Sequence, residues 1–223
     1  MGVPAAGGFL GRLTDADSAD LMSIGRRQSF ETDATLLTEG ERSDRLVLLL
    51  SGRVKLSNFT EDGREVLLGI RDPGDLLGEL SAMDGQPRSA CVTAIEPSEG
   101  LVITGASFRS FLERSPKAAV ALLEMVIGRL RDADLKRIEF SAYDTVGRVA
   151  RRLVEMADRF GTRGSEGLEI AVALSQDDLA GWVGCSREAA AKALRLLRDE
   201  GLVRTGRRSI TIVDHDALVE RSR

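Results

Sequence analysis

The sequence holds few of the residues that build metal sites, disulfides or aromatic surfaces. Its 223 residues include two cysteines, one histidine, one tryptophan and one tyrosine, and aromatic residues make up only 4%. Because zinc sites and iron–sulfur clusters need several Cys or His ligands, we expect no metal cofactor. Cys91 and Cys185 lie far apart in apolar surroundings, which predicts small core residues rather than a disulfide.

Long apolar runs are also missing. No segment approaches the roughly 20 apolar residues that a transmembrane helix needs. The N-terminal residues Met1-Gly2-Val3-Pro4 lack the basic and apolar regions of a signal peptide. These absences predict a cytoplasmic protein with no membrane partner. The sequence shows no grouping of a nucleophile with a base either, so we predict no catalytic residue and no enzyme.

Acidic residues slightly outnumber basic ones. The count is 35 against 31, and the net charge of −4 by itself argues against nucleic acid as a partner. The charge is unevenly distributed, however, because residues 142–223 hold 14 Lys and Arg against 13 Asp and Glu. The acidic first part of the chain therefore masks a locally basic C-terminal part.

Residues 29–104 combine short β-rich runs with frequent turn signals. The apolar run 46–50 is followed by Ser51-Gly52, and the run 66–70 is followed by Asp72-Pro73-Gly74. Turns at intervals of about 8–12 residues are typical of small barrels and sandwiches. On either side of this β-rich part we expect short helices, one or two within residues 9–27 and another at 108–112.

The segment 78–90, with the sequence GELSAMDGQPRSA, is the most informative part of this region. Two glycines bracket a turn-prone stretch that a carboxylate opens at Glu79 and that Arg88 and Ser89 close. Backbone N–H groups, a guanidinium and a hydroxyl that converge on one point suit a phosphate, and a carboxylate can accept from a sugar hydroxyl. The segment predicts a phosphate site, with an ordinary polar hairpin loop as the alternative.

A long helix is expected from residue 116 to about 141. Pro116 suits its first turn, and apolar residues then recur at spacings of three and four. This stripe consists of Leu123, Val126, Ile127, Leu130, Ala133 and Ile138. A narrow stripe on so long a helix indicates a coiled-coil-like dimer seam, and the alternative is a single core helix.

A helix at 145–160, a polar loop at 161–167 and a strand at 168–172 lead to a second informative segment. Ser175 can cap a helix that Gly184 ends, and Ser186 can cap a second helix that runs to about residue 199. A hairpin with a basic tip follows at 202–212. This succession predicts a winged helix-turn-helix.

The second helix of this pair has an apolar face and a charged face at about 100° per residue. Arg187 can pair bidentately with guanine, and Glu188 can accept from cytosine N4. The alternative is an amphipathic helix with a solvated face. We expect DNA contacts from the two helices and the wing, at Ser175, Gln176, Ser186, Arg187, Glu188, Lys192, Arg195 and Arg207.

The motifs GEL…RSA at 78–90 and VGCSRE at 183–188 occur in the order found in the CRP/FNR family of bacterial transcription regulators. The chain resembles the cyclic AMP receptor branch of this family over nearly its whole length. The resemblance implies an α+β fold with three parts: a cyclic-nucleotide-binding β-roll (a jelly roll, or double-stranded β-helix) at 1–114, a dimerisation helix at 115–141, and a winged helix-turn-helix at 142–223. It also implies an allosteric homodimer on a pseudo-palindromic duplex operator, with RNA polymerase as a partner at 162–166.

The same resemblance implies a ligand set. Gly78 and Glu79 would hold the ribose side, with Leu80 as a further ligand residue, and Arg88 and Ser89 would hold the cyclic phosphate. Arg129 of the long helix would reach back toward the same site, and Asp134 of this helix is a further candidate ligand that the family pattern does not supply.

At residues 133–134 the chain departs from the cyclic AMP pattern. It has Ala133-Asp134 where the family pattern has a Thr-Ser pair that contacts adenine across the dimer. Asp134 is either a base ligand or a solvated side chain. Cyclic AMP is the expected effector, with cyclic GMP or no effector as alternatives. A regulated enzyme and a pure interaction module are more distant alternatives.

Overall fold

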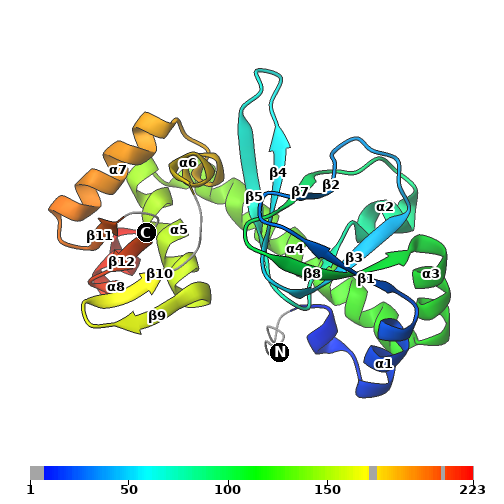
Figure 1. Cartoon of the computed structure of the whole chain (residues 1–223). Coiled ribbons are helices and arrows are strands. Elements are labelled where there is room, and N and C mark those ends of the chain that lie inside the picture. Colours follow the sequence, from blue (N-terminus) through cyan, green and yellow to red (C-terminus); the bar gives the residue numbers. More distant parts are fainter. Residues whose placement is uncertain (1–7, 171–174, 207–208, 223) are drawn as a thin grey trace. The chain divides into compact units, whose positions relative to one another are not determined.

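The computed structural model describes residues 8–170, 175–206 and 209–222 (Figure 1). The chain forms two compact units. The first holds the N-terminal part through Asn58 together with Leu68–Asp132, and the second holds Phe59–Leu67 and the chain from Ala133 onward. Sheets and helices occur in both units, so the predicted α+β class is confirmed.

Two four-stranded sheets form the β-roll, whose strand residues belong to the first unit except for Phe59 and Glu65–Leu67. Their pairings β1–β8, β3–β8, β2–β7 and β4–β7 are antiparallel. One sheet has the order β1 (Arg26–Phe30), β8 (Ser98–Thr104), β3 (Arg45–Ser51) and β6 (Leu76–Leu77). The other has the order β2 (Thr35–Leu37), β7 (Cys91–Ala94), β4 (Val54–Phe59) and β5 (Glu65–Arg71).

Strand β3 shows why this part of the sequence is a continuous apolar run. Leu46 and Leu48 belong to a core cluster with Phe108 and Phe111, whereas Val47 and Leu49 belong to a second cluster. Because successive side chains of a strand point to opposite faces, both faces of β3 are buried.

Helices cover one side of this core. They are the short 3₁₀ helix η1 (Leu10–Arg12), α1 (Asp15–Ser23) and α3 (Gly105–Arg114). Thr14 caps α1, and Thr104 caps α3. The prediction of helix up to residue 27 was wrong, because Arg26 and Arg27 pair with β8 as part of β1. The prediction for α3 was too short, because its cap lies at Thr104.

Helix α4 (Pro116–Ala142) matches the predicted long helix. Ala118, Ala121, Leu122 and Met125 are buried in the core of the first unit. At 100° per residue most of the predicted stripe lies on another side of the helix, although Val126 of the stripe packs against the core. Most of its large side chains are 39–61% exposed, namely Leu123, Ile127, Leu130 and Ile138, and Val120 and Leu135 are exposed as well. The helix therefore has two apolar sides, and the described part of the chain buries only one of them.

The second unit contains the predicted helix α5 (Thr145–Phe160), which Asp144 caps. Its sheet has the order β11-β12-β10-β9. The predicted loop at 161–167 was wrong in part, because Gly161–Gly164 form β9 and pair with β10. Strand β10 covers Gly167–Ile170, and the last two residues of the predicted strand lie outside the described residues. The remaining elements are α6 (Gln176–Val183), α7 (Arg187–Asp199), β11 (Val203–Gly206), β12 (Ser209–Ile212) and α8 (His215–Arg221).

A buried ionic network fixes the end of α4 within this unit. Glu139 of α4 is 8% exposed and pairs with Arg152 of α5, while its other oxygen lies 2.7 Å from Arg151 Nε. Arg152 also pairs with Glu155. Breaking a buried ion pair leaves an uncompensated charge, which is costly. The last turns of α4 are therefore held firmly against α5.

Candidate nucleotide pocket and nucleic-acid interface

The predicted phosphate segment contains a short helix, α2 (Glu79–Asp84), rather than an open hairpin loop. Gly78 precedes the helix with φ 77°, and Gly85 ends it with φ 71°. Both angles are left-handed, which glycine adopts without strain. A Cβ on Gly78 would lie 2.5 Å from Arg88 Nη1, so glycine also gives the guanidinium room to approach the backbone.

Arg88 lies at the centre of this segment and is only 3% exposed. Its Nη1 donates to the Gly78 carbonyl at 2.7 Å, and its Nη2 donates to the Arg45 carbonyl. Burial lowers the pKa of the guanidinium. The buried Nε of Arg88 has no acceptor among the described residues. A buried guanidinium with an unused donor is suited to an anionic ligand.

The long helix contributes Arg129 to the same segment. Its Nη1 donates to Glu79 Oε1 at 2.6 Å, and its Nη2 donates to the Leu76 carbonyl at 2.9 Å. The second nitrogen also lies 3.6 Å from Asp75 Oδ1. Because Glu79 is 5% exposed, this charge pair is largely removed from water. It ties α4 to α2.

The other predicted ligands are more open. Leu80 and Ser89 are exposed residues within the segment 78–90. Asp134 is an exposed residue of α4 in the second unit, so its ligand role stays a prediction. The sequence did not indicate Arg45 or Asp75, because both reach the segment through tertiary contacts rather than through a local motif.

The helix-turn-helix has the predicted geometry. Ser175 and Asp178 form a capping box at the start of α6, and Gly184 ends this helix with φ 68°. The Ser186 side chain then accepts from the Ala189 backbone N–H at the start of α7. The inner faces of both helices bury Leu179, Trp182, Ala190, Ala193, Leu194 and Leu197, so the polar faces remain exposed.

The predicted DNA-contacting residues that the structure describes are all exposed on these helices. Arg187 Nη1 lies 3.4 Å from Asp177 Oδ2, in a pair that water surrounds. The pKa of Glu188 is lowered, first by its own backbone N–H and then by the Ser186 hydroxyl, so the carboxylate is ionised at neutral pH. The predicted wing residue Arg207 lies outside the described residues.

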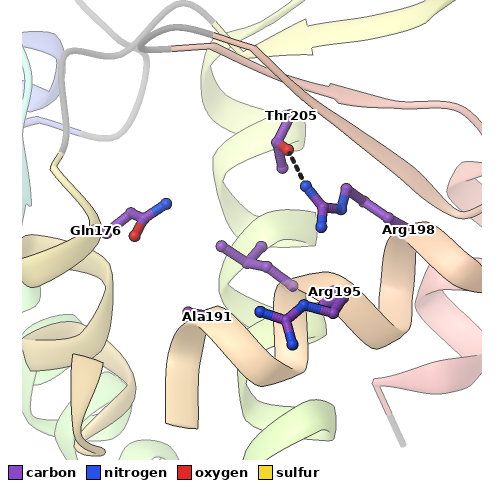
Figure 2. A pocket seen from close by; sticks show the side chains of 6 residues that line it. Gln176, Ala191, Arg195, Arg198 and Thr205 are labelled. Carbon is purple, nitrogen blue, oxygen red and sulfur yellow. Dashed lines mark hydrogen bonds between the residues drawn. The ribbon is translucent and has the colours of Figure 1, made fainter. Parts of the chain in front are cut away.

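Figure 2 shows a small cavity between α6, α7 and β11. Its volume is about 200 Å³, and Arg198 Nη1 donates to Thr205 Oγ1 at 3.1 Å beside it. The lining residues are Gln176, Ala191, Leu194, Arg195, Arg198 and Thr205. The sequence places Arg198 and Thr205 in the predicted DNA-binding helix and wing, but it did not single out either residue as a contact. The position of Arg198, three residues after Arg195 on one helix, was an available signal.

Metal clusters and membrane-spanning helices are both absent from residues 8–170, 175–206 and 209–222. In these ranges, no group of three or more His, Cys, Asp or Glu residues could hold a metal ion. None of the helices described is long and apolar enough to span a membrane.

Comparison with known proteins relates both sites to families. Residues 27–115 match the model of the cyclic nucleotide-binding domain, and residues 147–221 match the Crp-like helix-turn-helix domain. A CRP-like cAMP-activated global transcriptional regulator of Mycobacterium tuberculosis is 36% identical over 194 residues, which cover 87% of each chain. The cyclic AMP receptor protein of Thermus thermophilus is 29% identical over 199 residues, or 89% of each chain.

Solved structures agree with this relationship at the level of the fold. The global regulator CLP of Xanthomonas campestris, which is described as responsive to c-di-GMP, superposes with a TM-score of 0.81 at 21% identity. The match covers 90% of this chain and 100% of that one.

Proposed function

Since the chain belongs to the CRP/FNR family of transcription regulators, we propose that it is a homodimer whose binding to a pseudo-palindromic operator is controlled by cyclic AMP. At the coarser level it is a DNA-binding regulator that responds to a cyclic nucleotide, and its relatives are regulators rather than enzymes. The observation that carries the proposal is the Arg129–Glu79 pair. This pair links the ligand segment to the helix that bears the exposed apolar stripe.

The cyclic phosphate is proposed to bind Arg88 and Ser89, with the ribose at Gly78, Glu79 and Leu80. Glu79 already accepts from Arg129 at 2.6 Å, so a ribose hydroxyl that donates to Glu79 shares this carboxylate with α4. Ligand binding therefore changes the ion pair between Glu79 and Arg129 that holds α4 to the ligand segment. A ligand that binds one arrangement of α4 more tightly shifts the population toward that arrangement.

The exposed stripe on α4 supports the dimer, because two copies that pair along it bury apolar side chains that one chain leaves in water. A two-fold axis between the helices gives two copies of α7 for two half-sites, about 34 Å apart on the duplex. The segment 162–166 lies at the β9–β10 hairpin. We propose this hairpin as the surface that contacts RNA polymerase, on the basis of the family resemblance.

Arg187→Ala tests the DNA-reading helix. Arg187 is exposed in the first turn of α7, where a guanidinium can bind guanine O6 and N7. We expect its loss to weaken binding by about 1–3 kcal/mol and to relax the preference at one base position of each half-site. The measurement is fluorescence anisotropy with duplexes selected from a random pool, in the presence of cyclic AMP.

Arg26→Ala is the matched control, because Arg26 is an exposed arginine of β1 in the first unit. It should leave affinity and sequence preference unchanged. If Arg187→Ala binds the selected duplex as tightly and as selectively as the wild type does, α7 does not read bases through this residue.

The double substitution Ala133→Thr with Asp134→Ser tests the effector. Ionised Asp134 offers only acceptors to a base, whereas hydroxyls both donate and accept. We expect the double variant to bind cyclic AMP more tightly than the wild type does, as measured by titration calorimetry with cyclic AMP and cyclic GMP.

Asp134→Ala separates the two roles of this carboxylate. A fall in nucleotide affinity would make it a base ligand, and an unchanged affinity would make it a solvated residue. If neither nucleotide binds the wild type at millimolar concentration, the effector-independent regulator replaces the proposal.

A further inference from the structure

We propose that Arg195, Arg198 and Thr205 form a site for a phosphate of the DNA backbone, at the end of α7 away from the base-reading residues. The inference rests on the proposed DNA-binding function. Arg198 and Thr205 lie within the helix and the wing that the sequence predicts to bind DNA, but neither is among the single contact residues expected there.

The chemistry of the cavity in Figure 2 fits an anionic oxygen ligand. Two guanidiniums, one hydroxyl and one amide line it, and no carboxylate does. Among the described residues, neither Arg195 nor Arg198 is paired with an acidic side chain. Two neighbouring cations without a counter-ion repel each other, so an anion between them is stabilised. The cavity of about 200 Å³ is large enough for a phosphate group.

The hydrogen bond from Arg198 Nη1 to Thr205 Oγ1, which is 3.1 Å long, adds a residue of the wing to the site. It joins α7 to the wing strand β11 and uses one of the five N–H donors of the guanidinium. The remaining donors can bind phosphate oxygens, and the hydroxyl of Thr205 can donate as well. One phosphate bound there contacts the recognition helix and the wing together.

The position along α7 favours the DNA backbone over a free anion as the source of this phosphate. Arg195 and Arg198 follow Arg187 by eight and eleven residues, which is about 12 and 17 Å along a helix. The major groove is about 12 Å wide, so a helix that places Arg187 at the base edges carries these two arginines to the strand that borders the groove. Phosphate contacts at that place fix the register of the helix on the duplex.

Arg198→Gln in the full-length chain is the test. Binding to the selected duplex and to an unrelated duplex is measured by anisotropy across a series of KCl concentrations. Because a phosphate contact carries no base information, we expect affinity for both duplexes to fall about tenfold at low salt. The slope of log K against log[salt] should become less negative by about 0.9 for each phosphate that the variant no longer neutralises.

Three further variants complete the experiment. Arg195→Gln should reproduce the change in slope, and it keeps the test valid if Arg198→Gln fails to fold. Thr205→Val removes the hydroxyl with little change of shape, and it should weaken both duplexes by a smaller factor. Arg26→Gln removes an exposed arginine of β1, and it should leave the slope unchanged.

The outcomes distinguish this inference from the proposed function. A wild type that bound neither duplex would overturn both. Suppose that Arg187 is needed for specificity, but that Arg198→Gln and Arg195→Gln show the wild-type slope of log K against log[salt]. In that case only the backbone contact is overturned, and the proposed function stands. Calorimetry with inorganic phosphate at constant ionic strength tests whether the cavity binds a free phosphate compound instead of the DNA backbone. Phosphate binding that Arg198→Gln abolishes without any change in the DNA slope would assign the cavity to a free phosphate compound and overturn the DNA contact.

Discussion

Arg88→Ala is expected to lower the affinity for a cyclic nucleotide by about a hundredfold or more. Arg88 is 3% exposed, and its Nε has no acceptor among the described residues. Hydrogen bonds to a charged group contribute about 1.5–3 kcal/mol each, and a planar guanidinium can form two with one phosphate. Titration calorimetry with cyclic AMP measures the loss.

The same side chain also supports the fold, through bonds to the Gly78 and Arg45 carbonyls. Thermal unfolding of the variant is therefore measured in parallel. Arg88→Lys keeps the charge but loses the fork geometry, so we expect intermediate affinity. Ser89 is exposed, and Ser89→Ala should weaken binding with little effect on unfolding. A folded Arg88→Ala protein with wild-type affinity would show that the phosphate binds elsewhere.

Leu130→Glu is expected to convert a dimer into monomers. Leu130 is 61% exposed in the single chain and lies within the apolar stripe of α4. A dimer along this stripe places two new carboxylates near the two-fold axis, where burial and mutual repulsion both oppose association. Because each buried charge costs several kcal/mol, we expect association to weaken by more than about a thousandfold. Sedimentation equilibrium measures the mass.

Leu130 is 61% exposed and belongs to neither of the two core clusters of the first unit. The fold of the monomer should therefore survive, as circular dichroism can show. Lys117→Gln is the matched control, since Lys117 is an exposed residue of the same helix away from the stripe and the substitution also lowers the net charge by one. A Leu130→Glu protein that keeps the mass of a dimer would show that the apolar stripe of α4 is not the dimer interface.

The helices of this protein are determined largely by local sequence. Helices α5, α6 and α7 begin after Asp144, Ser175 and Ser186, whose side chains accept from backbone N–H groups three residues ahead. Capping acts within one turn, so the sequence alone locates these boundaries. Local signals of this kind also made the ligand segment, the long helix and the helix-turn-helix recognisable along the chain.

Strands depended more on distant partners. Arg26, Arg27 and Gln28 have no alternating apolar pattern, and they form β1 because β8 supplies hydrogen bonds from a distant part of the chain, at Gly100–Val102. The glycine-flanked segment Gly161–Gly164 similarly becomes β9 through its pairing with β10. Propensity for a strand is weak where neighbouring strands decide the packing.

Local sequence identifies the residues that carry the chemistry of the ligand segment and of the recognition helix, because glycine, arginine and caps at fixed spacing are local signals. The contacts of these residues depend on the folded chain. Arg129 lies 50 positions from Glu79, Arg88 lies 43 positions from Arg45, and Arg198 meets Thr205 across two elements. Such contacts exist only after the chain has folded, because packing of whole strands and helices brings the side chains together and no local spacing encodes their distance.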